Sequence, residues 1–189
     1  MIACIPAAVL GLLFDDWMEA HLYNAYVVAA TLIIYGVLFI VLENSSITAN
    51  PSITKVGHVS TKTALFIGLF QLLSLVPGTS RSGSTILGAM VLGCSRGVAA
   101  EFSFFLGIPV MFGASFLKLV KFFVKGNVLT GPQIFYTILG MAIAFGVSVY
   151  SIQFLMGYVR RHDFKFFGYY RIILGVVVLA YFGITALAA

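Results

Sequence analysis

Residues 64–94 read ALFIGLFQLLSLVPGTSRSGSTILGAMVLGC, two short apolar arms around a polar turn. As a helix, the apolar arm over residues 64–76 would extend only about 20 Å, and the arm over residues 86–94 only about 14 Å. The hydrocarbon core of a bilayer is about 30 Å thick, so neither arm can cross it. Two short arms joined by a polar turn predict a re-entrant hairpin whose tip lies at membrane depth, enclosed by protein or facing a watery cavity. The alternative is an ordinary surface loop between two tilted short helices.

The sequence around this hairpin is that of a membrane protein. Apolar residues make up 61% of the 189 residues and charged residues only 9%, against about 25% charged residues in soluble domains. Apolar runs of a length that can span a bilayer cover residues 25–42, 98–119, 131–156 and 169–187. We therefore predict an all-α integral membrane protein, a single domain over residues 1–189 with transmembrane helices and one re-entrant helical hairpin.

Polar segments between these runs predict aqueous loops at residues 15–24, 43–63, 118–130 and 157–168, with His21, His58 and His162 solvated in them. Most cations form clusters beside the spans, which is typical of anchoring to anionic lipid headgroups. The clusters are Lys55 and Lys62; Lys118, Lys121 and Lys125; and Arg160, Arg161, Lys165 and Arg171. No basic patch interleaved with aromatic residues indicates nucleic-acid binding. The charge bias of the loops is contradictory, so it does not assign the leaflet that the hairpin faces.

The polar turn of the hairpin holds the residues best suited to chemistry. Arg81 would lie near the bilayer centre, where an arginine costs about 2.5–3.5 kcal/mol on insertion scales and normally pairs or serves a function. Its planar fork suits two-pronged recognition of a phosphate. Hydroxyl groups, glycines that let backbone amides approach, and a helix N-terminus near Ser84 would complete an anion cradle. The other residues of this cradle are Gly78, Thr79, Ser80, Ser82, Gly83 and Thr85.

A structural role is the alternative for these residues. Ser and Thr at the start of a helix are ordinary caps, and Arg81 could pair with Glu101, which lies early in the next span. Glu101 could also orient Arg81 for function, bind a metal or act as a base. Gln71, in the first arm, could bind at the tip or cap a neighbouring backbone group.

Three segments resemble the undecaprenyl-diphosphate phosphatase family, also called bacitracin-resistance proteins. Residues 71–86, QLLSLVPGTSRSGSTI, resemble the second signature of that family; residues 101–104, EFSF, fall where the family carries the same string; and residues 2–14, IACIPAAVLGLLF, look like a further family segment. The resemblance runs from Met1 nearly to Ala189 and corresponds to the C-terminal two-thirds of the family.

The resemblance implies an enzyme of the bacterial cytoplasmic membrane that removes the terminal phosphate of undecaprenyl diphosphate, recycling this carrier lipid for peptidoglycan synthesis and giving bacitracin resistance. It implies an inverted repeat with two re-entrant hairpins, of which this chain holds one. Arg81 would then grip the diphosphate, and Ser80 and Ser82 would support it. The family also implies Mg²⁺ or Ca²⁺, although no ligand set is identifiable in the sequence, and a homodimer is left open.

The sequence departs from the family in one respect. The first signature of the family, two glutamates four residues apart followed by Pro-Val-Ser-Ser and a nearby Gly-His, supplies the proposed acid, base and nucleophile, and nothing here corresponds to it. We therefore expect a truncated chain that hydrolyses almost no substrate alone. The alternative functions are a transporter or flippase for lipid phosphates and a non-catalytic remnant that only binds lipid.

Overall fold

The computed structural model describes residues 2–159 and 162–188, and its regular elements are all helical. In chain order they are η1 (Ile2–Cys4), α1 (Ile5–Leu22), α2 (Ala25–Glu43), α3 (Ser46–Ala49), η2 (Val56–His58), α4 (Thr61–Leu72), η3 (Leu73–Leu75), α5 (Arg81–Val91), α6 (Arg96–Val124), α7 (Gly131–Val159) and α8 (Lys165–Ala188). Four of them, α2, α6, α7 and α8, are long and apolar enough to cross a membrane. The prediction of an all-α, multi-pass membrane protein is confirmed.

Two helices extend into segments that the sequence predicts as loops. Helix α6 continues to Val124, so Lys118 and Lys121 are helical rather than in a loop. Helix α1 continues to Leu22, so most of the predicted loop at 15–24, including His21, is helical as well. Lysine is a good helix former and can keep its charged end in water while its stem covers apolar surface. The end of an apolar run therefore does not mark the end of its helix.

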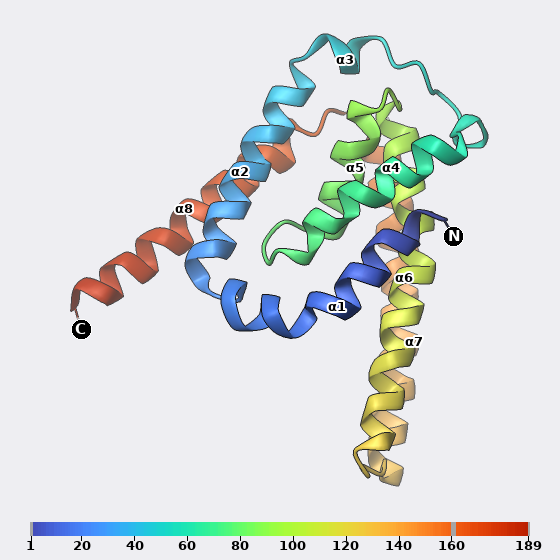
Figure 1. Cartoon of the computed structure of the whole chain (residues 1–189), viewed down its shortest axis with the longest axis vertical. Helices are drawn as coiled ribbons and strands as arrows, with labels where there is room; N and C mark the ends of the chain where they lie inside the picture. Colours follow the sequence, from blue (N-terminus) through green and yellow to red (C-terminus); the bar gives the residue numbers. More distant parts are fainter. Residues whose placement is uncertain (1, 160–161, 189) are drawn as a thin grey trace.

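The long helices form two pairs with the hairpin helices between them (Figure 1). Helices α2 and α8 lie side by side, α6 lies beside α7, and α4 and α5 occupy the centre. Glycines allow the first pair to approach closely: a Cβ on Gly36 would lie 2.7 Å from the carbonyl oxygen of Gly168, and one on Gly175 would lie 2.9 Å from that of Ala29. Small residues commonly mediate such packing in membrane proteins. This contact fixes α8 against α2, which in turn packs against the hairpin helix α5.

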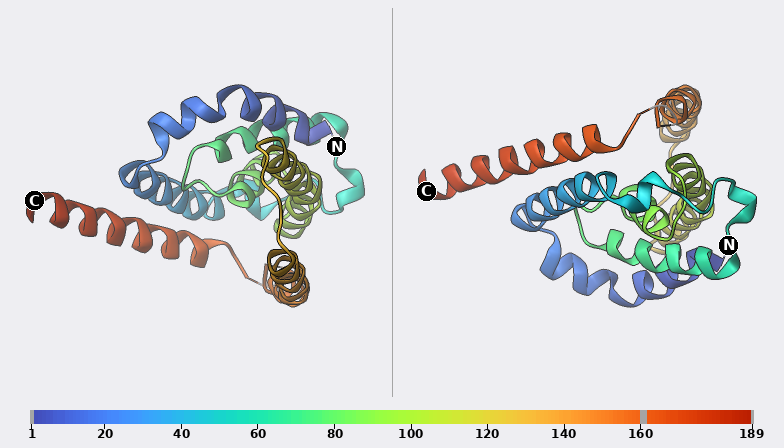
Figure 2. Two further views of the ribbon diagram at one scale, coloured as in Figure 1. Left: turned by 90° about the horizontal axis from the view of Figure 1, so that it is seen from below. Right: turned by 90° about the horizontal axis from the view of Figure 1, so that it is seen from above.

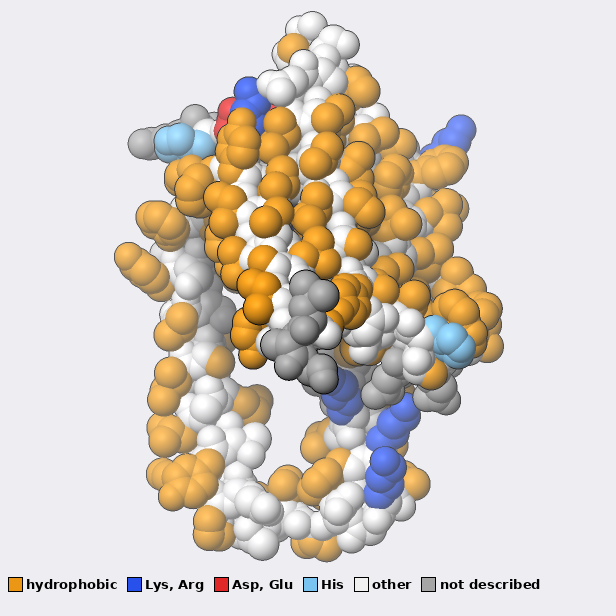
Figure 3. Space-filling model, turned by 90° about the vertical axis from the view of Figure 1, so that its left-hand side faces the viewer, with side chains coloured by type: hydrophobic (Ala, Val, Ile, Leu, Met, Phe, Trp, Pro, Cys, Tyr) orange, Lys and Arg blue, Asp and Glu red, His pale blue; other side chains and the backbone are white. Residues whose placement is uncertain are grey.

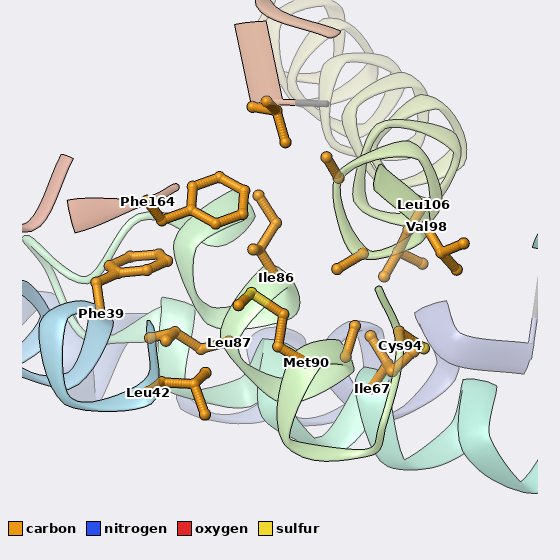
Figure 4. Packing of buried hydrophobic residues seen from close by; sticks show 14 of the residues in the cluster. Phe39, Leu42, Ile67, Ile86, Leu87, Met90, Cys94, Val98, Leu106 and Phe164 are labelled. Atoms are coloured by element: carbon orange, nitrogen blue, oxygen red, sulfur yellow. The ribbon is translucent and has the colours of Figure 1, made fainter. Parts of the chain in front are cut away.

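Helix α5 is the centre of the hydrophobic core (Figure 4). It has only 11 residues, and every residue from Gly83 to Met90 is buried. Its side chains Ile86, Leu87 and Met90 contact a cluster contributed by α2, α4, α6 and the segment before α8. Labelled members of that cluster are Phe39, Leu42, Ile67, Val98, Leu106 and Phe164. Enclosure by protein on all sides is what a short helix ending at membrane depth requires.

The outer surface is strongly apolar. Figure 3 shows one face covered mainly by hydrophobic side chains, with few Lys and Arg side chains in view. The C-terminal part of α8 extends away from the central helices (Figure 2), and the far ends of α6 and α7 do so as well (Figure 1). Side chains of α7 such as Phe145 and Tyr150 are more than 70% exposed. Exposed apolar surface of this extent suits contact with lipid or with other apolar protein surface rather than with water.

One end of the bundle is held by a buried carboxylate, that of Glu43 at the end of α2. The Glu43 side chain is fully buried and accepts hydrogen bonds from Nε of Arg96 at 2.9 Å and from the backbone N–H of Phe164 at 2.9 Å. The sequence predicts Glu43 at the start of an aqueous loop, and this prediction is wrong. The ion pair joins segments distant in sequence, so no local pattern could reveal it.

Candidate functional site

The tip of the hairpin is an irregular turn that ends in a helix cap. Helix α5 begins at Arg81, three residues before the predicted start near Ser84, and Ser80 is its N-cap. The Ser80 side chain accepts a hydrogen bond from the backbone N–H of Gly83 at 3.3 Å. Ser80 has a φ of +62°, a left-handed conformation that is uncommon for residues other than glycine. Strained conformations of this kind concentrate at functional sites, where the surroundings hold them in place.

Neighbouring helices hold this turn in place. The Thr31 hydroxyl of α2 lies 2.8 Å from the carbonyl oxygen of Pro77, and Nη1 of Arg171 in α8 donates to the carbonyl oxygen of Thr79 at 3.2 Å. Gly78, with a φ of +89°, packs so closely on α2 that an added Cβ would collide with Thr31 and Val28. Gly78 is therefore needed for packing against α2, and its expected role in ligand binding stays a prediction.

Arg81 lies on the side of the tip that faces α6. Its side chain is partly buried, and Nη1 donates to the carbonyl oxygen of Ser103 at 3.4 Å. A Cβ on Gly107 would come within 2.6 Å of Nη2, so the guanidinium lies directly against the helix there. The expected pairing with Glu101 is not among the ion pairs of the described residues. Glu101 instead lines a separate cavity that also contains Lys55 and Arg96.

Four of the residues predicted to bind substrate point into the protein. The Thr79 side chain is buried and donates to the carbonyl oxygen of Val76 at 2.7 Å. Ser84 donates to the Tyr35 hydroxyl at 3.1 Å, and the hydroxyls of Thr85 and Ser103 lie 2.7 Å apart. Gln71 is also buried, and neither of its amide atoms has a hydrogen-bond partner in the part of the chain that the structure describes. The α-helical rotation that follows from a start at Arg81 turns Ser84 and Thr85 toward neighbouring helices.

Ser80 and Ser82 remain accessible at the tip. Their hydroxyl oxygens lie 3.2 Å apart, and both side chains line a cavity of about 170 Å³ together with Gly83 and Arg171. As the first residues of α5, Arg81 and Ser82 carry backbone N–H groups that have no acceptor within the helix. Hydroxyls, free N–H groups and a nearby guanidinium are the donors that bind phosphate oxygens.

Arg171 is a residue of this site that the sequence analysis missed. It was assigned to the cluster of headgroup-binding cations with Arg160, Arg161 and Lys165; the first two lie outside the described residues. The structure places Arg171 in the second turn of α8, in contact with the tip. An arginine inside an apolar run was the one available signal, because such residues are rare unless they serve a function.

The structure does not identify a metal site. No group of three or more His, Cys, Asp or Glu side chains comes together in the described part of the chain. The expectation of Mg²⁺ or Ca²⁺ therefore stays a prediction, and we derive no chemical step through either ion.

Comparison with known proteins agrees with the resemblance read from the hairpin. The model of the family described as bacitracin resistance protein BacA matches residues 1–177. The chain belongs to this family. An undecaprenyl-diphosphatase of Streptococcus thermophilus is 56% identical over 181 residues, which cover 96% of this chain and 63% of the relative. Undecaprenyl-diphosphatases of Lactobacillus delbrueckii subsp. bulgaricus, 57% identical over 93% of this chain and 64% of the relative, and of Enterococcus faecalis, 52% identical over 96% of this chain and 66% of the relative, are similar to it as well. The chain thus spans a little under two-thirds of the length of these members of the BacA family.

Proposed function

We propose that the protein acts as an undecaprenyl-diphosphate phosphatase of the bacterial cytoplasmic membrane. It would remove the terminal phosphate of the lipid carrier, return the carrier to peptidoglycan synthesis and give resistance to bacitracin. The names of its relatives and its family support this function. The structural observation that carries it is Arg81, an arginine with no carboxylate partner among the described ion pairs, located beside the N-terminus of α5.

The contacts of the tip support its location at membrane depth. Thr31, which lies beside Pro77, is well inside α2, and Gly107, which lies beside Arg81, is well inside α6. Both helices are long and apolar enough to span a bilayer. If both helices span the bilayer, a residue that contacts them at positions well away from their ends lies below the headgroup region. A polyprenyl diphosphate anchored by its chain can present its phosphates there.

The described residues suit phosphate binding and charge stabilisation. The planar fork of Arg81 can hold two oxygens of the terminal phosphate, and the Ser80 and Ser82 hydroxyls can donate to other oxygens of the diphosphate. Phosphoryl transfer depends mainly on such positioning and electrostatic stabilisation of the transferred group. Attack on phosphorus also requires an activated nucleophile. Among the described side chains no carboxylate or histidine is hydrogen-bonded to Ser80, Arg81 or Ser82. We propose that the activating groups come from the part of the family protein that the match does not include.

Phosphate release from undecaprenyl diphosphate in detergent tests this function. The purified chain is assayed alone and after co-expression with the segment of the Streptococcus thermophilus relative that lies outside the match. We expect almost no release by the chain alone and clear release by the combination. Arg81→Lys in the combination should lower the rate about 100-fold, because lysine keeps the charge without the two-pronged geometry, whereas Lys165→Gln should leave it unchanged. An Arg81→Lys rate within a few-fold of the parent, or movement of labelled lipid across vesicles without phosphate release, would contradict the proposal.

A further inference from the structure

Arg171 is a second cation at the tip. Its guanidinium is partly buried, 6.0 Å from the centroid of the Phe39 ring, and donates from Nη1 to the carbonyl oxygen of Thr79. No carboxylate lies within ion-pair distance of it among the described side chains. Lys165, one turn and a half earlier in α8, does have such a partner, Asp163 at 3.8 Å. A charged residue inside an apolar helix without a counter-ion is a candidate for ligand binding.

Arg171 and Arg81 flank different sides of the tip. Arg171 lines the cavity of about 170 Å³ together with Ser80, Ser82 and Gly83, and Arg81 is not among the residues that line this cavity. Arg81 instead contacts α6 at Ser103. The positive charge in the cavity beside the Ser80 and Ser82 hydroxyls therefore comes from Arg171 of α8 and not from Arg81 of the hairpin.

Apart from Ser80, Ser82 and Arg171, the walls of this cavity are apolar. Besides the tip, aromatic and aliphatic side chains line it, notably Phe39, Phe104, Leu155, Phe164 and Phe167. Among these, Phe164 packs against both Phe39 and Phe167. A guanidinium and two hydroxyls in a cavity with otherwise apolar walls match a ligand that carries a phosphate on a hydrocarbon chain.

We propose that Arg171 binds the phosphate next to the lipid chain of a polyprenyl diphosphate, while Arg81 meets the terminal phosphate. This inference rests on the proposed function. The isoprenoid units nearest to the diphosphate would lie against the aromatic walls of the cavity. The phosphate bonded to the lipid must then be the one closer to those walls. A guanidinium has five N–H donors, so the single hydrogen bond to Thr79 orients Arg171 and leaves donors for the phosphate.

The test compares three ligands that share one isoprenoid chain: farnesol, farnesyl phosphate and farnesyl diphosphate. Their affinities for the full chain in detergent are measured for the parent, Arg171→Gln, Arg171→Lys and Arg81→Gln, with Lys165→Gln as a control on the same helix. Arg171→Gln should weaken both phosphate ligands about tenfold or more and leave farnesol unchanged. Arg81→Gln should weaken farnesyl diphosphate alone. Arg171→Lys should fall between the parent and Arg171→Gln, since it keeps the charge but not the fork.

The outcomes separate this inference from the function on which it rests. The role of Arg171 would be overturned if Arg171→Gln bound both phosphate ligands with affinities within twofold of those of the parent, while Arg81→Gln still lowered the affinity for farnesyl diphosphate. Equal loss of all three ligands by Arg171→Gln and Arg171→Lys would make Arg171 only a structural support of the tip. A parent chain that binds farnesyl diphosphate no more tightly than farnesol would contradict the proposed function itself, and this inference with it.

Discussion

Thr31 in α2 and Pro77 at the tip of the hairpin are joined by a hydrogen bond of 2.8 Å between the threonine hydroxyl and the proline carbonyl oxygen. The bond links α2, which is long enough to span the membrane, to the turn between α4 and α5, which are each too short to span it. Gly78, the next residue, packs on the same part of α2. The position of the tip is thus set by α2 as well as by the hairpin's own sequence.

Replacing Thr31 should show how much this contact contributes. Thr31→Val keeps the shape of the side chain and removes its hydroxyl, which leaves the Pro77 carbonyl without that donor. We expect a loss of about 1 kcal/mol in stability, measured as a lower thermal midpoint in detergent, together with weaker binding of farnesyl diphosphate. Thr31→Ser retains the hydroxyl and should behave more like the parent. If both variants lose the same stability, the contact depends on the methyl group instead.

Labelling of cysteines should report the depth of the tip. In a background of Cys4→Ser and Cys94→Ala, Ser80→Cys places a thiol on a side chain that is exposed in the structure, and Asn50→Cys places one in the segment between α3 and η2. If the tip lies at membrane depth, Ser80→Cys should react slowly with a bulky impermeant maleimide in sealed vesicles, whichever side the reagent is on. Rates as fast as those of Asn50→Cys would place the tip at the surface.

Gly107 offers a way to displace Arg81 without changing it. A Cβ at this position would lie 2.6 Å from Nη2 of Arg81, so Gly107→Ala should push the guanidinium away from α6. We expect a loss of farnesyl diphosphate affinity of about tenfold, because a small displacement removes hydrogen bonds to the phosphate. Gly113→Ala on the same helix is the matched control, since nothing lies within 4 Å of its added Cβ. Equal binding by the two variants would show that the contact of Arg81 with α6 does not affect its function.

The buried carboxylate of Glu43 should matter for folding and not for ligand choice. Glu43→Ala removes the partner of Arg96 and the acceptor for the backbone N–H of Phe164. The cost should be about 2–4 kcal/mol, less than for a fully buried pair because Arg96 is partly exposed and can be hydrated. Lys165→Gln, which removes an exposed ion pair, should cost less than about 1 kcal/mol. Thermal midpoints of the two variants measure the difference, and similar midpoints would show that the Glu43 pair adds little.

The sequence predicted the positions of the long helices and the residues of the tip better than the limits of the helices. The apolar runs at 25–42 and 131–156 predicted α2 and α7 well, because hydropathy and length are local properties. Their limits were less accurate, since lysines extend α6 and acidic residues extend α1 beyond the apolar segments. The same reasoning picked out Ser80, Arg81 and Ser82, because an arginine in a polar turn between short apolar arms is conspicuous in any membrane protein.

Hydropathy and run length were enough to predict the membrane character of the protein, the four helices that can cross a bilayer, the hairpin and the residue types at its tip. Which of those residues face the cavity depends on the packing of the helices. This packing turned Ser84 and Thr85 toward Tyr35 and Ser103, and it brought Arg171 to Thr79 across 92 residues of sequence. The physical reason is that the direction of a side chain depends on where its helix starts, and its partners depend on how helices pack. Neither property is contained in a run of apolar residues.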